Sequence, residues 1–280
     1  MRFKYAESSF YLSQIGVQLL NKKKRWSTWL IFGMILLLSV MSLSFYLPNA
    51  KKERAEESPR KEKEKKVETV ESGGSDLLQE SGQKVRVKDW ATLELIDRFK
   101  VEKEYIVDRM QIYVKEVKLI KMTDIMNEEK EYLSYFNNKT KNELLREGNK
   151  YADWEELNEA VDRSGWNVEE AAYYIEIAYN VTNKYEKEVQ FFSFLDVQFG
   201  EELFFVPGRN FIASDDTFVG ESSFSRIDYR KGETREGEIG LLLKKLPKQA
   251  DTVQFSTDDV LDGDTHELIS QGQTFRIYLE

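Results

Sequence analysis

The residues with the clearest chemical potential lie near the carboxyl end of the chain. His266-Glu267-Leu268-Ile269-Ser270 begins like the His-Glu-x-x-His helix of zinc proteases. Ser270 stands where the second histidine ligand is needed, and the chain has only one histidine. A two-histidine zinc site therefore cannot form, and we expect His266 to be an ordinary surface side chain.

Carboxylates around Gly263 are the next candidates, because calcium prefers oxygen ligands. The group comprises Asp258, Asp259, Asp262, Asp264 and Glu267. Their spacing does not match the twelve-residue helix–loop–helix calcium site, so we predict an acidic turn, with a cation site as the weaker alternative. The pair Asp215-Asp216 is weaker still. Paired carboxylates could also serve glycoside cleavage, but only their separation in space would decide that.

Other catalytic signatures do not hold. Ser58-Pro59-Arg60-Lys61 matches the Ser-x-x-Lys spacing of penicillin-interacting enzymes, but it lies in a run of charged residues that cannot position a nucleophile. The chain has no cysteine, which excludes disulfides, thiolate catalysis and cysteine-ligated metals. We therefore predict a protein that is not an enzyme and that binds no cofactor.

An uncharged segment, Trp26–Leu47, predicts one transmembrane helix. Its 22 residues would span about 33 Å as a helix, enough for a hydrocarbon core of about 30 Å. A cleaved signal peptide is the alternative, but Pro48-Asn49-Ala50 fits a cleavage site poorly. We expect an uncleaved signal anchor in a cell membrane, with residues 1–25 as a cytoplasmic tail.

Charge supports this orientation only in part. Lys22-Lys23-Lys24-Arg25 directly precedes the helix and favours a cytoplasmic amino end, whereas basic residues of 51–66 argue the other way. Long domains cross membranes largely regardless of charge, so we place the carboxyl-terminal domain outside. Residues 1–47 have a net charge of +5 and the whole chain −9, which leaves −14 for the remainder. Such an acidic domain excludes nucleic acid as an expected partner.

Residues 48–84 read as a charged, flexible linker, and residues 85–280 as the extracytoplasmic domain. In that domain, hydrophobic and polar residues alternate, as in half-buried strands. The alternation places Met110, Ile112 and Val114 on one face. It does the same for Ile175, Ile177, Tyr179 and Val181, and for Ile239, Leu241 and Leu243. We expect Asn183–Lys187 to be a hairpin turn and Val189–Phe199 a long strand with a bulge near Ser193. The prediction is a mainly β, antiparallel sandwich.

Residues 123–171 break the alternation and predict an α-helical insertion. Thr140 with Glu143, and Asp153 with Glu156, have the spacing of helix amino-terminal caps, while Gly148 and Gly165 suit helix ends. The large apolar residues of the insertion are Tyr132, Phe136, Trp154 and Trp166. They either pack the insertion on the sandwich or form an exposed partner-binding surface.

The strand and turn sequences from Tyr174 onward resemble a known family. Tyr174–Val189 resembles its pattern of strand, Asn, charged turn and strand, and Phe194–Gly200 its next strand and turn. Arg230–Ile239 resembles its Pro-Gly-Glu loop, with Lys231 where Pro is usual. The family is the telokin-like, immunoglobulin-fold group of exported bacterial proteins, common in Gram-positive bacteria. The resemblance covers about residues 100–280 without the insertion. It implies an immunoglobulin-like binding or structural module and no catalytic residues.

These features together predict a non-enzymatic protein-interaction module, anchored outside the membrane of a Gram-positive-type bacterium, in an accessory or immunity-type role. Its partner would be a protein at the cell surface or in a membrane assembly. The alternatives are a structural subunit of a secretion or conjugation assembly, and a cell-wall hydrolase.

Overall fold

Antiparallel β-sheets dominate the computed structural model, which describes residues 67–148, 150–219, 226–247 and 251–280. The chain divides into two units, residues 1–63 and residues 64–280, of which the second contains all described residues. The expected tail, residues 1–25, and the expected membrane helix, Trp26–Leu47, lie outside the described residues. Within the described part, no helix is long and apolar enough to cross a membrane.

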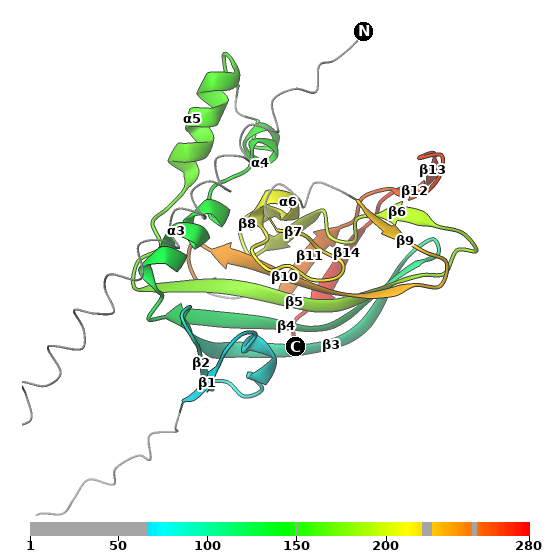
Figure 1. The fold of residues 1–280 in the computed structure, drawn as a ribbon. Coiled ribbons are helices and arrows are strands. Elements are labelled where there is room, and N and C mark those ends of the chain that lie inside the picture. The colour runs from blue at the N-terminus through cyan, green and yellow to red at the C-terminus, as the bar shows by residue number, and fades with distance from the viewer. Residues whose placement is uncertain (1–66, 149, 220–225, 248–250) are drawn as a thin grey trace, which may run out of the picture. The chain divides into compact units, whose positions relative to one another are not determined.

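A six-stranded sheet forms one layer of the fold (Figure 1). Its strands, in spatial order, are β1 (Glu68–Val70), β2 (Lys84–Val87), β3 (Thr92–Val107), β4 (Met110–Thr123), β5 (Ala171–Asn183) and β10 (Thr234–Leu243). All neighbours pair antiparallel except β1 and β2, which are parallel.

Two four-stranded sheets pack on one face of this layer. The first consists of β14 (Thr274–Tyr278), β11 (Thr252–Ser256), β7 (Asp196–Phe199) and β8 (Glu202–Phe205). The second consists of β13 (Leu268–Ser270), β12 (Val260–Asp262), β6 (Val189–Phe191) and β9 (Ile227–Tyr229). The main core lies between them and the six-stranded sheet. This arrangement is consistent with the predicted β sandwich.

The predicted alternation is confirmed in β4, β5 and β10. Met110, Ile112 and Val114 are buried in the main core. The inward residues of β5 and β10 join them there, as the alternation indicates: Ile175, Ile177, Tyr179, Val181, Ile239, Leu241 and Leu243. Burial of these apolar side chains supplies the main driving force for closing the two layers.

Two expectations about the next segment are wrong. Val189–Phe199 is not one strand, because β6 and β7 belong to different four-stranded sheets. Asn183–Lys187 is not a hairpin turn, because β5 pairs with β4 and β10 while β6 pairs with β9 and β12. The segment instead crosses between layers. The buried Asn183 amide stabilises the crossing by donating to the carbonyls of Lys187, Tyr229 and Arg230.

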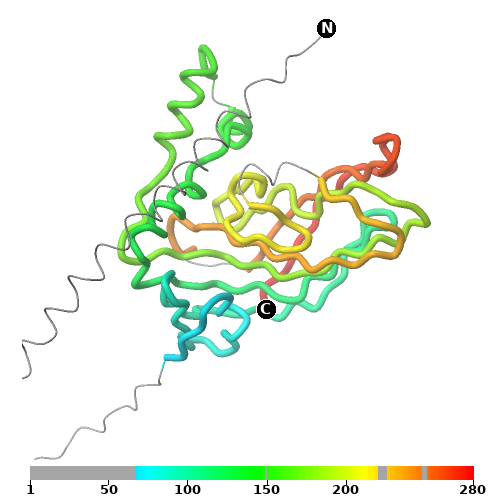
Figure 2. Tube along the Cα trace, in the orientation of Figure 1, coloured from blue at the N-terminus to red at the C-terminus, as the bar shows by residue number. Residues whose placement is uncertain are grey.

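The helical insertion lies between β4 and β5, as predicted. It contains α3 (Asn127–Phe136), α4 (Lys141–Arg146) and α5 (Trp154–Ser164). Thr140 and Glu143 form a reciprocal capping box at the start of α4, and Asp153 accepts bonds from two backbone amides of α5. Gly148 has a positive φ of 79°, which suits a helix end, whereas Gly165 is extended. Figure 2 traces this excursion of the chain away from the sheets.

The folded domain begins earlier in the chain than expected. Residues 67–84, assigned above to the linker, contain β1 and a short 3-10 turn, η1 (Ser75–Leu77). Leu78, which follows the turn, is fully buried in a second core on the outer face of the six-stranded sheet. Burial of Leu78 helps to fix this otherwise polar segment, because it removes a whole leucine side chain from water.

Candidate functional site

The helical insertion is joined to the sandwich by a buried ion pair. Arg209 lies in α6 (Val206–Arg209), the turn that follows β8, and its Nη1 is 3.2 Å from Glu143 Oε1 in α4. The Arg209 Nε also donates to the Phe136 carbonyl at 2.9 Å, and the backbone amide of Phe205 donates to Glu143 Oε1. Such a pair is geometrically specific, so it sets where the insertion sits on the sheets.

Several large apolar side chains of the insertion are exposed to water. Tyr135 is 82% exposed and Trp154 is 63% exposed. Tyr132, Met126 and Leu145 are exposed to a smaller degree. The Lys141 ammonium lies 4.2 Å from the centre of the Trp154 ring, a cation–π contact that orients the indole between α4 and α5.

The four aromatic residues singled out from the sequence divide into two groups. Tyr132 and Trp154 are exposed, as a partner surface requires. Phe136 is buried, and Trp166 is partly buried against the second core, with its backbone amide donating to Asn137 Oδ1 at 3.1 Å. Phe136 and Trp166 therefore hold the insertion in place.

Sequence reasoning missed Tyr135, the most exposed large apolar residue in the described chain. The helical periodicity carries the signal that would have found it. Leu133 and Phe136 are the buried residues of α3 and define its inner face. Tyr135 lies about 200° around the helix from Leu133, on the opposite side.

A surface groove of about 590 Å³ lies between α3, α5 and the segment that joins α3 to α4. Tyr135 and Trp166 line it, together with the carboxylates of Glu131 and Asp162 and the ammonium of Lys139. On α3, burial and then the charge of Glu128 raise the pKa of Glu129 above its ordinary value. The combination of aromatic faces and carboxylates suits a cationic group.

The acidic residues near the carboxyl end belong to the β12–β13 hairpin and its flanks. Asp262 Oδ2 pairs with Lys187, and its Oδ1 accepts from the amides of Asp264 and Thr265. Asp258 Oδ2 lies 2.9 Å from Arg226, and Asp259 Oδ1 accepts from the Gly272 amide. Among the described residues, no cluster of three or more His, Cys, Asp or Glu side chains could hold a metal ion. The acidic turn, with a cation site as its weaker alternative, stays a prediction.

The remaining residues considered for catalysis do not come together in one site. Asp215 is exposed, whereas Asp216 is buried and accepts a hydrogen bond from Ser193. His266 is exposed, and its Nδ1 lies 2.9 Å from Gln190 Oε1. Ser58-Pro59-Arg60-Lys61 lies outside the described residues.

Comparison with known proteins assigns no family. No protein-family model matches the chain, and no curated protein matches it. A functionally unknown protein from Listeria monocytogenes EGD-e is 9% identical, with a TM-score of 0.35, over 67% of this chain and 86% of that one. At this TM-score the likeness carries no argument, and the telokin-like resemblance stays a prediction.

Proposed function

We propose that this chain is a membrane-anchored, extracytoplasmic protein-interaction module that is not an enzyme. Trp26–Leu47 would be the anchor, with residues 1–25 on the cytoplasmic side. We also propose, from the telokin-like resemblance, that the domain is immunoglobulin-like and that the protein comes from a Gram-positive-type bacterium. The described fold supports it at the coarser level of a mainly β domain with antiparallel sheets.

The observation that carries the proposal is the exposed apolar surface of the insertion. Tyr135 and Trp154 present rings to water on helices that the Glu143–Arg209 pair holds in place. Aromatic residues of this kind dominate the binding energy of protein interfaces, and exposing them without a partner is unfavourable. The rigid attachment lowers the entropic cost of presenting them to a partner.

Charge indicates what the partner offers. Residues 127–165 contain ten acidic and six basic residues. The groove beside Tyr135 is lined by the carboxylates of Glu131 and Asp162. We therefore expect a protein partner that contributes basic side chains around an apolar contact, with an association rate that falls as salt increases.

The test is crosslinking and capture from membranes that contain the full-length protein. Tyr135→Ala and Trp154→Ala should each reduce the captured partner by tenfold or more, as expected for interface aromatics worth about 2 kcal/mol. Tyr278→Ala is the matched control, because Tyr278 is 58% exposed but lies in β14, away from the insertion. Equal capture by all three variants would contradict the proposal.

Two other functions predict different outcomes. For a structural subunit of a secretion or conjugation assembly, residues 1–47 would also make contacts, so an unrelated anchor in their place would abolish activity. For the interaction module, that exchange leaves activity intact. A cell-wall hydrolase would give a clear band in peptidoglycan zymography, which the proposal excludes.

A further inference from the structure

Charged side chains form two rows across the outer face of the six-stranded sheet. Strand register places Arg98 of β3 opposite Lys118 of β4, and Lys118 opposite Glu176 of β5. The next row holds Glu116 of β4 and Glu238 of β10, on either side of Ala178. Alternation alone would assign this face to solvent.

These groups bind one another closely. The Lys118 ammonium lies 2.9 Å from Glu116 Oε1 and 3.4 Å from Glu176 Oε1. Arg98 Nε is 2.6 Å from Glu116 Oε2, and the Tyr174 hydroxyl donates to Glu176 Oε2 at 3.3 Å. The Lys118 and Glu176 side chains are only 2% and 1% exposed, so these two charged groups are sealed from water.

The seal is made by residues 73–82, which we call the flap. The Ser75 carbonyl accepts a hydrogen bond from Lys118 Nζ at 3.0 Å, and the Ser75 side chain bonds Glu176. Leu78 is fully buried beside them. Positive φ angles at Gly73, Gly74 and Gly82 mark both ends of the flap, where only glycine bends the backbone at little cost.

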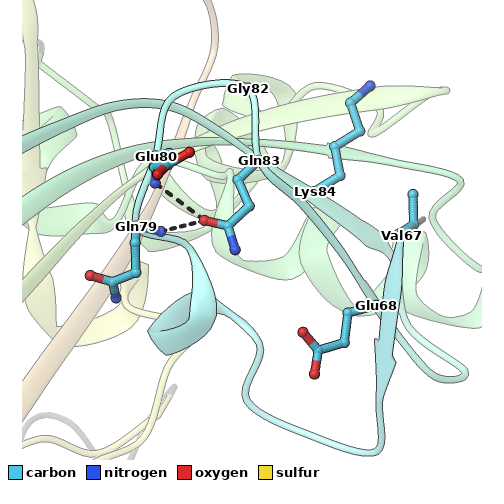
Figure 3. A pocket seen from close by; sticks show the side chains of 7 residues that line it. All are labelled: Val67, Glu68, Gln79, Glu80, Gly82, Gln83 and Lys84. Atoms are coloured by element: carbon cyan, nitrogen blue, oxygen red, sulfur yellow. Dashed lines mark hydrogen bonds between the residues drawn. The ribbon is translucent and has the colours of Figure 1, made fainter. Parts of the chain in front are cut away.

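The flap is held as a unit by a side chain at its base. Gln83 Oε1 accepts from the backbone amides of Gln79 and Glu80 (Figure 3). The Gln83 side-chain amide also donates to the Leu77 carbonyl at 2.7 Å. These bonds are exposed to water. A hollow of about 690 Å³ lies beside them, lined by Val67, Glu68 and Lys84 among others. The outer side of the flap is thus exposed to water, while its inner side covers the buried Lys118 and Glu176.

The cluster has more carboxyl groups than cations. Lys118 of β4, Tyr174 of β5 and Glu238 of β10 act directly on Glu176. Beyond them, Glu116 of β4 pairs with Arg98 of β3 and with Lys118, and the charge of Asp76 in η1 acts on Glu238. Burial, and then the charge of Glu238, raises the pKa of Glu176 to about 8. The pKa of Glu238 is also raised by burial, whereas Lys118 and Arg98 keep that of Glu116 low despite its burial.

We propose that Glu176 is a proton-binding site that controls the flap: residues 73–82 close over Lys118 and Glu176 when Glu176 is protonated, and open when it is ionised. An ionised Glu176 beside Glu238 is stabilised by water, and water reaches it only when the flap lifts. Opening therefore releases a proton and becomes more favourable as pH rises. This inference does not depend on the proposed interaction function.

The test is amide hydrogen exchange of the full-length protein between pH 6 and pH 9, corrected for intrinsic exchange. Glu176 binds its proton more tightly in the closed state than in the open state. The equilibrium constant for opening, measured at residues 75–80, should therefore rise by about tenfold or more between pH 6 and pH 9. Glu176→Gln copies the protonated carboxyl, so its flap should stay closed at pH 9. Glu236→Gln is the matched control on β10, where Glu236 is exposed and pairs with Lys115.

Ser75→Ala supplies a second, independent variant. It removes the hydroxyl bonded to Glu176 but keeps the carbonyl that accepts from Lys118, so opening should increase at every pH with the pH dependence retained. The proposal is overturned if the wild-type flap exchanges at the same corrected rate at pH 6 and pH 9. It is also overturned if Glu176→Gln keeps the dependence, or if Glu236→Gln removes it.

Discussion

Arg209 Nη1 and Glu143 Oε1 lie 3.2 Å apart with both side chains almost wholly buried, although 66 residues separate them in the chain. The contact joins α4 of the helical insertion to the turn after β8. Glu143 at the same time completes the capping box of α4, because its side chain accepts a hydrogen bond from the backbone amide of the N-cap residue Thr140. One carboxylate therefore both starts a helix and fixes that helix to the sandwich.

Glu143→Gln should destabilise the protein by about 3–5 kcal/mol, because it leaves the Arg209 charge buried without a counterion. Urea unfolding of the domain measures the loss. Glu159→Gln is the control, since Glu159 pairs with Arg163 on the exposed face of α5 and should change stability by less than about 0.5 kcal/mol. Equal losses for both variants would mean that the buried pair does not hold the insertion.

Gly74→Ala should loosen the flap far more than Gly73→Ala. Both glycines have positive φ, 94° and 72°, so both alanines carry a backbone strain of about 1–2 kcal/mol. Only the Cβ at position 74 also meets Val87 Cγ2, at 2.7 Å, whereas the space at position 73 is open. Overpacking adds about 1–3 kcal/mol. Hydrogen exchange at Leu77 and Leu78 should show the difference, and similar exchange in the two variants would refute it.

Asn183→Ala should cost about 3 kcal/mol. It removes three donated hydrogen bonds and the bond that Asn183 Oδ1 accepts from the Tyr185 amide, and it leaves buried carbonyls unsatisfied. Asn180→Ala on the same strand should be nearly neutral, because the buried Asn180 Oδ1 has no hydrogen-bond partner among the described residues. Thermal unfolding of both variants checks the contrast. A loss as large for Asn180→Ala would contradict this account.

Stability should fall as pH rises from 5 to 8, partly through Asp216. Burial raises the pKa of Asp216 to about 7, against the opposing effect of hydrogen bonds from Ser193 and Tyr179. A raised carboxyl pKa means that the folded state binds the proton more tightly. The stability that Asp216 contributes is therefore fully present at pH values below its pKa in the unfolded chain. It is lost as pH rises from there toward 7, at up to about 1.4 kcal/mol per pH unit.

Asp216→Asn should therefore flatten the pH dependence of the unfolding free energy and raise stability at pH 8. Asp215→Asn, at the exposed neighbouring position, should keep the wild-type slope. Glu176 contributes a slope of the same sign, so Asp216→Asn reduces the dependence without abolishing it. An unchanged slope in Asp216→Asn would show that Asp216 is ionised in the folded protein throughout this range.

Local patterns predicted the elements well where one physical rule governs a whole segment. Alternation at Met110, Ile112 and Val114 identified β4 and its buried face. The Thr140–Glu143 spacing identified the start of α4. Both features act between residues at most four apart, so they are visible in the chain itself.

The sequence by itself determined which faces are apolar, where helices begin, and that a two-histidine zinc site and thiol chemistry are excluded. Only the tertiary structure decided which sheet each strand joins and which polar residues are buried. Lys118 and Glu176 alternate as solvent-facing residues should, yet Ser75 and Leu78, far away in sequence, seal them from water. Burial depends on contacts between distant segments, and no local pattern records those contacts.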